Sequence, residues 1–140
     1  MTQVVAVDDS RVIRTLLRQT LESEGYQVLE AADGQEALDA LRAVTEPCVV
    51  LLDYFMPNLD GGAVLATVAE EGGGLARHEF IVISQDVGTF PVEFIDLLRR
   101  LSIRIMPKPL QREAVVEAVA QAAQRLSMPP DPPLPLEADA

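Results

Sequence analysis

Short apolar runs alternate with amphipathic stretches along most of the chain, and this alternation restricts the possible folds more than any other feature. Between the apolar runs, apolar residues recur at helical spacing. Such an alternation predicts an α/β fold with a parallel sheet, because parallel neighbours need a helical crossover. The predicted strands cover residues 3–7, 26–30, 48–52, 80–84 and 103–106, and the predicted helices lie within 12–21, 36–44, 63–70, 91–101 and 111–126.

The third predicted strand indicates how the helices are arranged. Residues 48–52 are apolar without interruption, as in strands that are covered on both faces. We therefore expect a doubly wound (βα)5 sheet in a three-layer α/β/α arrangement. Residues 1–126 fit one domain of this kind, whereas residues 127–140 hold five of the ten prolines and three acids, which predicts a Pro-rich acidic tail or linker.

The charge balance excludes several classes of partner. The formal net charge is −11, so the chain lacks the basic footprint that direct nucleic-acid binding needs. No apolar run approaches the roughly 20 residues that span a bilayer. No signal-peptide pattern precedes the first strand, and the single cysteine cannot form an internal disulfide. We expect a cytoplasmic protein without a membrane segment, suited to divalent cations or basic protein surfaces.

Polar residues follow four of the predicted strands at the points where they end. Asp8 and Asp9 follow the first, Asp53 the third, Ser84 ends the fourth, and Lys108, the only lysine, follows the fifth. In open α/β sheets, ligands bind beyond the carboxyl ends of the strands. Each residue alone could be a helix cap, a turn residue or a solvated charge, but four strand ends together predict a site.

These residue types suit phosphoryl transfer. Three close carboxylates repel one another unless a cation or proton neutralises them, and hard cations such as Mg²⁺ or Mn²⁺ prefer such oxygen ligands. An aspartate can act as a nucleophile and form an aspartyl phosphate. A lysine ammonium and a serine hydroxyl can contact phosphate oxygens.

The order and spacing of these motifs resemble those of bacterial response-regulator receiver domains, including the chemotaxis regulators, over residues 3–126. The resemblance rests on Asp8-Asp9, Asp53, Met-Pro-Asn-Leu-Asp-Gly at 56–61, Ser84, and Lys108-Pro109. It implies a flavodoxin-like strand order 2-1-3-4-5. It also implies a phosphorylatable switch in a two-component system.

The resemblance implies roles for individual residues. Asp53 would accept a phosphoryl group from a histidine kinase or a histidine phosphotransfer protein. Asp9 would bind Mg²⁺ directly, Asp8 directly or through water, and the backbone carbonyl of Phe55 would complete the protein ligands together with Asp53. An output domain or downstream protein would then respond, and a homodimer could form through the helix after Pro91, the fifth strand and the last helix.

Further roles and two departures concern the end of the site nearest the fifth strand. Ser84 would move toward the phosphoryl group, Lys108 would contact Asp53 and the phosphate, and the peptide bond before Pro109 would be cis. The family often has an aromatic residue where this chain has Ile105, and a small residue where it has Gln85. Signalling through an aromatic ring at position 105 is therefore not expected.

Three further hypotheses follow from single positions. Bulky Gln85 and Phe55 predict slow loss of the phosphoryl group. His78, the only histidine, precedes a strand and is expected at the surface and not as a phosphoacceptor. As an alternative to a functional role, Asp9 or Ser10 could merely cap the first helix.

Two other function classes compete with the phosphorylatable switch. A Mg²⁺-dependent phosphotransferase or phosphatase with a D-x-D motif would need an acid two residues after Asp53, where this chain has Phe55. A phosphate-independent, receiver-like interaction module is the main alternative. Such modules usually lose an acidic residue or the lysine, and none is lost here.

Overall fold

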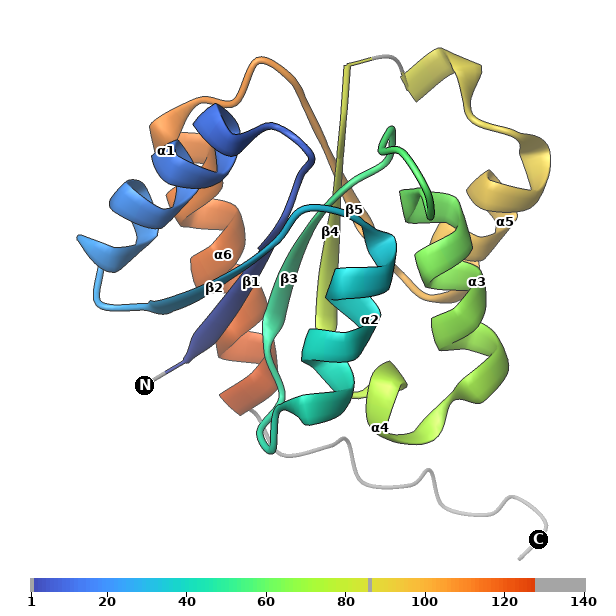
Figure 1. The fold of residues 1–140 in the computed structure, drawn as a ribbon, viewed down its shortest axis with the longest axis horizontal. Coiled ribbons are helices and arrows are strands. Elements are labelled where there is room, and N and C mark those ends of the chain that lie inside the picture. Colours follow the sequence, from blue (N-terminus) through green and yellow to red (C-terminus); the bar gives the residue numbers. More distant parts are fainter. Residues whose placement is uncertain (1, 86, 128–140) are drawn as a thin grey trace, which may run out of the picture.

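The computed structural model describes residues 2–85 and 87–127, and its centre is a five-stranded parallel sheet (Figure 1). The strand order is β2-β1-β3-β4-β5, which confirms the predicted order 2-1-3-4-5. The predicted tail over residues 127–140 lies outside the described residues, apart from Ser127. The strands are β1 Gln3–Val7, β2 Gln27–Ala31, β3 Val49–Asp53, β4 Glu79–Ser84 and β5 Arg104–Pro107.

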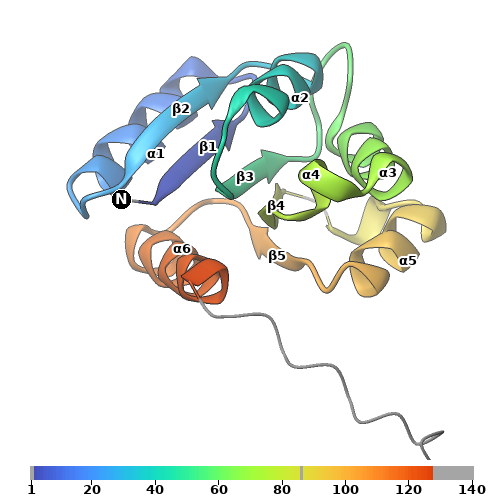
Figure 2. The ribbon, with the colours of Figure 1, turned by 90° about the horizontal axis from the view of Figure 1, so that it is seen from below.

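Helices cover both faces of the sheet, which confirms the three-layer arrangement. The helices α1 and α6 lie on one face, and α2, α3 and α5 lie on the other (Figure 2). Among the described residues, no helix is both long and apolar enough to cross a membrane. The helices are α1 Arg11–Glu22, α2 Gly34–Ala43, α3 Gly61–Glu71, the short α4 Gly73–Ala76, α5 Val92–Arg100 and α6 Arg112–Ser127, with a 3-10 turn at Val87–Thr89.

The sheet separates two apolar cores, and β3 contributes to both. Val50 and Leu52 of β3 pack in the core beneath α2, α3 and α5. Val49 and Leu51 face the core beneath α1 and α6. All residues of β3 are buried, as its uninterrupted apolar sequence predicts.

Side-chain caps fix the starts of three helices near the site. Ser10 caps α1 by accepting a hydrogen bond from the Ile13 N–H, and Asp60 caps α3. Asp33 caps α2 by accepting a hydrogen bond from the Glu36 N–H at 2.9 Å, and the Glu36 side chain accepts from the N–H of Ala32, one residue before the cap.

Two local features differ from the sequence predictions. Gly72 and Gly73, with φ of 58° and 53°, interrupt the helical course after α3, and a further short helix, α4, which was not predicted, begins at Gly73. The expected surface position of His78 is wrong, because this side chain is buried and its Nδ1 accepts a hydrogen bond from the Cys48 N–H at 2.9 Å. A buried backbone donor needs a partner, and His78 supplies it.

Candidate functional site

The carboxyl ends of four strands bring the polar residues together at one edge of the sheet. Asp8 directly follows β1, Asp53 ends β3, Ser84 ends β4 and Lys108 directly follows β5. The site lies beside the point where the strand order reverses, because β1 pairs with β2 on one side and with β3 on the other. The topology therefore brings together residues up to 100 positions apart in the chain.

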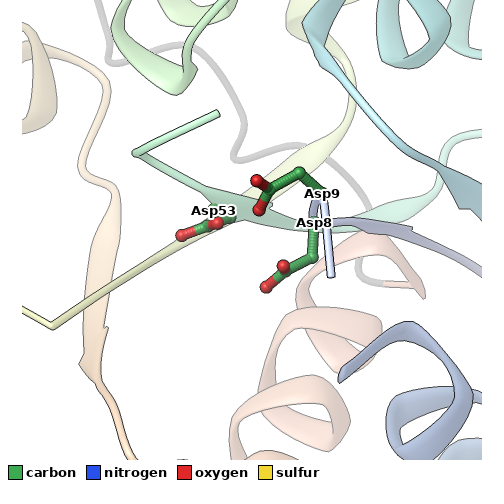
Figure 3. A group of neighbouring side chains, drawn as sticks. All are labelled: Asp8, Asp9 and Asp53. Carbon is green, nitrogen blue, oxygen red and sulfur yellow. The ribbon is translucent and has the colours of Figure 1, made fainter. Parts of the chain in front are cut away.

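Three carboxylates form the centre of the site. Asp8, Asp9 and Asp53 each offer an oxygen within 4.8 Å of those of the other two, and their side chains point into a shared space (Figure 3). Asp8 and Asp53 are buried, with 1% and 4% of their surface exposed, whereas Asp9 is exposed. The cluster thus has two sheltered carboxylates and one that faces solvent.

Lys108 provides the positive charge beside this cluster. Its Nζ lies 3.2 Å from Asp8 Oδ2 and 3.5 Å from Asp53 Oδ1. Its backbone N–H donates to the Ser84 carbonyl at 3.0 Å, and the Lys108–Pro109 peptide bond is cis. One ammonium against three carboxylates leaves two negative charges uncompensated.

This charge imbalance affects the pKa values of Asp53 and Lys108. Burial, followed by the charges of Asp8 and Asp9, raises the pKa of Asp53 to about 6, although Lys108 opposes the shift. Burial alone would lower the pKa of Lys108, but the facing charges of Asp53 and Asp8 raise it above its ordinary value. The ammonium is therefore strongly held in its charged form, while Asp53 is a more basic carboxylate than usual.

Backbone contacts hold Asp8 in place, and sequence reasoning missed this network. Asp8 Oδ1 accepts from the Ser10 N–H at 2.9 Å, and the Asp8 carbonyl accepts from the Arg14 guanidinium at 2.7 Å. Arg14 also pairs with Glu30 on β2 at 3.0 Å. The signal in the sequence is Asp-x-Ser before a helix, since an aspartate commonly accepts from the N–H two residues on.

The oxygen donors fit a hard divalent cation. Magnesium binds carboxylate oxygens at about 2.0–2.1 Å, so two ligand oxygens of one ion lie at most about 4.2 Å apart. The spread of up to 4.8 Å between the three carboxylates needs only a small contraction to reach this spacing. Asp9, which is exposed, and Asp53 are the residues best placed to hold such an ion, because both oxygens of Asp8 already have partners.

The residues expected to be unusual neighbours of the site occupy different environments. Phe55 lies two positions beyond Asp53, has a 51% exposed side chain, and packs edge-on against Tyr54. Gln85 is exposed and directly follows Ser84, which is fully buried. Ile105 is half-buried on β5, where it pairs with Val82 of β4 and packs against the core beneath α5.

The loop between β3 and α3 approaches the end of β3, at Asp53, very closely. A Cβ atom on Gly61 would lie 2.8 Å from the Asp53 carbonyl oxygen and 2.9 Å from the Tyr54 Cα. Any residue larger than glycine would therefore push α3 away from the site. This contact gives a physical reason for the Asp60-Gly61 pair in the sequence motif: the first residue caps the helix and the second allows the approach.

Sequence comparisons identify the relatives of this chain. The profile of the family described as "Response regulator receiver domain" matches residues 4–120. The chain is 31% identical over 141 residues to the response regulator MprA of Mycobacterium ulcerans, a match that covers 91% of this chain and 60% of that protein. It is 42% identical over 73 residues to the MprA of Mycolicibacterium vanbaalenii, covering 52% of this chain and 31% of that protein. The chain thus spans less than two thirds of these curated relatives.

Solved structures agree with this assignment. The NtrC4 receiver domain dimer in its beryllofluoride-activated state has a TM-score of 0.74 at 26% identity, covering 91% of this chain and 100% of that one. The chemotaxis regulator CheY4 of Vibrio cholerae has a TM-score of 0.72 at 26% identity, covering 90% and 98%. A CheY-like receiver protein from Methanospirillum hungatei shares the fold, with a TM-score of 0.78 at 21% identity, covering 89% and 96%. The chain therefore belongs to the response-regulator receiver domain family of two-component signalling.

Proposed function

We propose that this receiver domain accepts a phosphoryl group on Asp53 with the help of Mg²⁺, and that the phosphoryl group changes its interaction with an output domain or a partner protein. The observation that supports this most strongly is the convergence of Asp8, Asp9 and Asp53 with Lys108 at one sheet edge. The donor would be a histidine kinase or a histidine phosphotransfer protein. The chain would act in the cytoplasm, where such donors are made from ATP.

The properties of Asp53 suit the role of nucleophile. With a pKa of about 6, it is mostly ionised at pH 7, by about ten to one. A carboxylate oxygen would attack the phosphorus of the donor phosphohistidine, so that an O–P bond forms while the P–N bond breaks. The electron pair of the P–N bond leaves with the imidazole nitrogen, and Asp53 becomes an acyl phosphate.

The remaining residues would bind and neutralise charge. A bound Mg²⁺ would supply compensation for the phosphoryl oxygens, held by Asp9, Asp53 and the backbone carbonyl of Phe55, with Asp8 binding directly or through water. Lys108, already 3.5 Å from Asp53, would reach a phosphoryl oxygen by a small movement. Ser84, at the end of the neighbouring strand, would donate a hydrogen bond to another oxygen.

The role of the domain would be to switch and not to turn over a substrate. Each phosphorylation event modifies Asp53 of the chain itself. The phosphorylated and unphosphorylated forms would differ in the stability of two conformations, which is how a local charge change biases a distant surface. The predicted homodimer surface would consist of α5, β5 and α6.

Intact-mass spectrometry after incubation with acetyl phosphate and Mg²⁺ tests this proposal. We expect one phosphoryl adduct in the wild type and in Asp96→Ala, since Asp96 is an exposed carboxylate on α5. The adduct should disappear in Asp53→Ala and in the presence of a metal chelator. No adduct in the wild type, together with failure of a cognate kinase to phosphorylate it, would favour the phosphate-independent interaction module.

A further inference from the structure

Aromatic side chains are scarce in this chain, yet most of them gather in one place. The sequence has four phenylalanines, two tyrosines and no tryptophan. Three of the phenylalanines contact Tyr54, with ring centroids 4.7 Å away for Phe55, 4.6 Å for Phe90 and 4.6 Å for Phe94. Phe90 and Phe94 also contact each other at 4.9 Å. Tyr54, Phe90 and Phe94 therefore form a closed triangle of rings, here called the aromatic triangle.

Tyr54 connects this triangle to the phosphorylation site. It directly follows Asp53, and because side chains alternate along a strand, its ring faces the core beneath α3 and α5. Its backbone is held on both sides: the N–H donates to the Ile83 carbonyl at 3.0 Å, and the carbonyl accepts from the Gly61 N–H at 2.9 Å. These two hydrogen bonds fix the backbone position of Tyr54 next to Asp53.

The other two rings belong to the segment that follows Ser84. Phe90 lies between β4 and α5, and Phe94 lies in the first turn of α5. Both are buried, with 6% and 4% of their surface exposed. Because protein interiors are close-packed, a displacement of the chain after Ser84 would move the Phe90 ring against Tyr54 and Phe94.

The triangle also borders a groove at the surface. A groove of about 620 Å³ between α3 and α5 is lined by Tyr54 and Phe94, together with Pro91 and Leu97 of the α5 region. A shift of Phe94 would carry α5 with it and change the width of this groove. The triangle thus lies between the phosphoacceptor and a surface that could report its state.

We propose that the aromatic triangle is the element that couples the phosphoryl state of Asp53 to the position of α5 and to the shape of the α3–α5 groove. This inference rests on the proposed function of Asp53. Tyr54, Phe90 and Phe94 are positioning residues, since none of them touches the reacting atoms. The aliphatic Ile105 on β5 takes no part in these ring contacts.

Hydrogen exchange of α5 amides tests the coupling, measured on the whole chain with and without beryllium fluoride and Mg²⁺ as a stable mimic of the phosphoryl group. Phe90→Leu removes one ring of the triangle and keeps an apolar side chain. Phe80→Leu is the matched control, because Phe80 is also buried but lies on β4, where its ring is 6.5 Å from His78. The phosphoryl adduct formed from acetyl phosphate is measured in parallel by intact-mass spectrometry, so that phosphorylation is followed separately from coupling.

We expect the mimic to change α5 exchange in the wild type and in Phe80→Leu. In Phe90→Leu the adduct should still form, while the change in α5 exchange should fall about fivefold or more, as expected when an aromatic pair is lost from a two-state equilibrium. If Phe90→Leu does not fold, Phe90→Met is measured in its place, because methionine fills the space with a flexible chain.

Three results would overturn this inference but leave the proposed function standing. The first is a wild-type adduct without any change in α5 exchange, and the second is a change in α5 exchange in Phe90→Leu or Phe90→Met equal to that of the wild type. The third is a change in α5 exchange that falls as much in Phe80→Leu as in Phe90→Leu. Absence of an adduct in the wild type would overturn the proposed function and this inference with it.

Discussion

Replacing Asp53 by asparagine should stabilise the metal-free protein at neutral pH, although it removes the proposed phosphoacceptor. The Asp53 carboxyl group is buried, and its pKa in the folded protein is about 6, against an ordinary value of 3.8. A shift of about two pKa units corresponds to about 3 kcal/mol of unfolding free energy. The uncharged amide avoids this cost and has nearly the same shape.

The direction of the pKa shift determines the pH dependence. Because the folded pKa of Asp53 is raised, the unfolded chain loses this proton first as the pH increases. The protonated group therefore stabilises the fold fully below its unfolded pKa near 4, and this contribution is lost as the pH rises through about 6. Above pH 7 the ionised carboxylate costs the folded state about 3 kcal/mol.

Urea unfolding in the presence of a metal chelator measures this effect. The stability of Asp53→Asn minus that of the wild type should increase by about 2.5 kcal/mol between about pH 4 and pH 7.5. Asp96→Asn, on the exposed side of α5, is the control and should follow the wild type within about 0.5 kcal/mol. If the unfolding free energies of Asp53→Asn and the wild type differ by the same amount at both pH values, the argument is refuted that burial and the neighbouring carboxylates disfavour the ionised form of Asp53.

Magnesium should reduce this stability difference through the same charges. At 100 times its dissociation constant, an ion that binds only the folded state stabilises it by about 2.7 kcal/mol. The wild type should gain about this much at pH 7.5, and Asp53→Asn should gain clearly less because one carboxylate ligand is missing. Equal gains in the two proteins would show that the ion does not bind at this cluster.

Three other perturbations have defined outcomes. Burial lowers the pKa of His78 to about 4, so as the pH falls from about 6.5 to 4 the unfolded chain takes up the proton first. The wild type should therefore lose up to about 3 kcal/mol of unfolding free energy relative to His78→Gln over this range. An equal change of unfolding free energy with pH in both proteins, measured by urea unfolding, would contradict this. In the presence of a metal chelator, Lys108→Met should destabilise the protein by roughly 2–4 kcal/mol at pH 7.5, since it leaves buried carboxylates without their cation. It should also slow adduct formation from acetyl phosphate. An unchanged unfolding free energy would count against the ion pairs. Phe55→Asn and Gln85→Ala should each shorten the half-life of the phosphoryl adduct several-fold by opening the approach of water, and half-lives equal to that of the wild type would refute the prediction of slow dephosphorylation.

Most of the fold could be predicted from the sequence because its local signals agree with one another. The uninterrupted apolar run of residues 48–52 predicted a strand buried on both faces, and β3 is such a strand. The start of α2 is also fixed locally, since Asp33 accepts a hydrogen bond from the Glu36 N–H within one turn. The strand order came from the family resemblance, because periodicity contains no information about which strands are neighbours.

The parts that the sequence did not reveal depend on contacts between distant residues. His78 is buried and accepts a hydrogen bond from the N–H of Cys48, which directly precedes β3, and nothing within one turn of His78 signals this. The aromatic triangle joins Tyr54 to rings 36 and 40 positions later, so no local pattern marks it. For the site, the strand-end rule predicted the meeting of Asp53 with Lys108, but not the contacts that hold Asp8.

Locating the phosphoryl group within the chain tests the central claim most directly. Acyl phosphates are reduced by borohydride to the alcohol, so treatment of the acetyl phosphate adduct followed by peptide mass spectrometry identifies the modified residue. We predict a single reduced residue at Asp53, formed only with Mg²⁺ present and equally in the Asp96→Ala control. Reduction at Asp8, Asp9 or any other carboxylate, or at Asp53 without a need for the metal, would contradict the assignment of Asp53 as the metal-dependent phosphoacceptor.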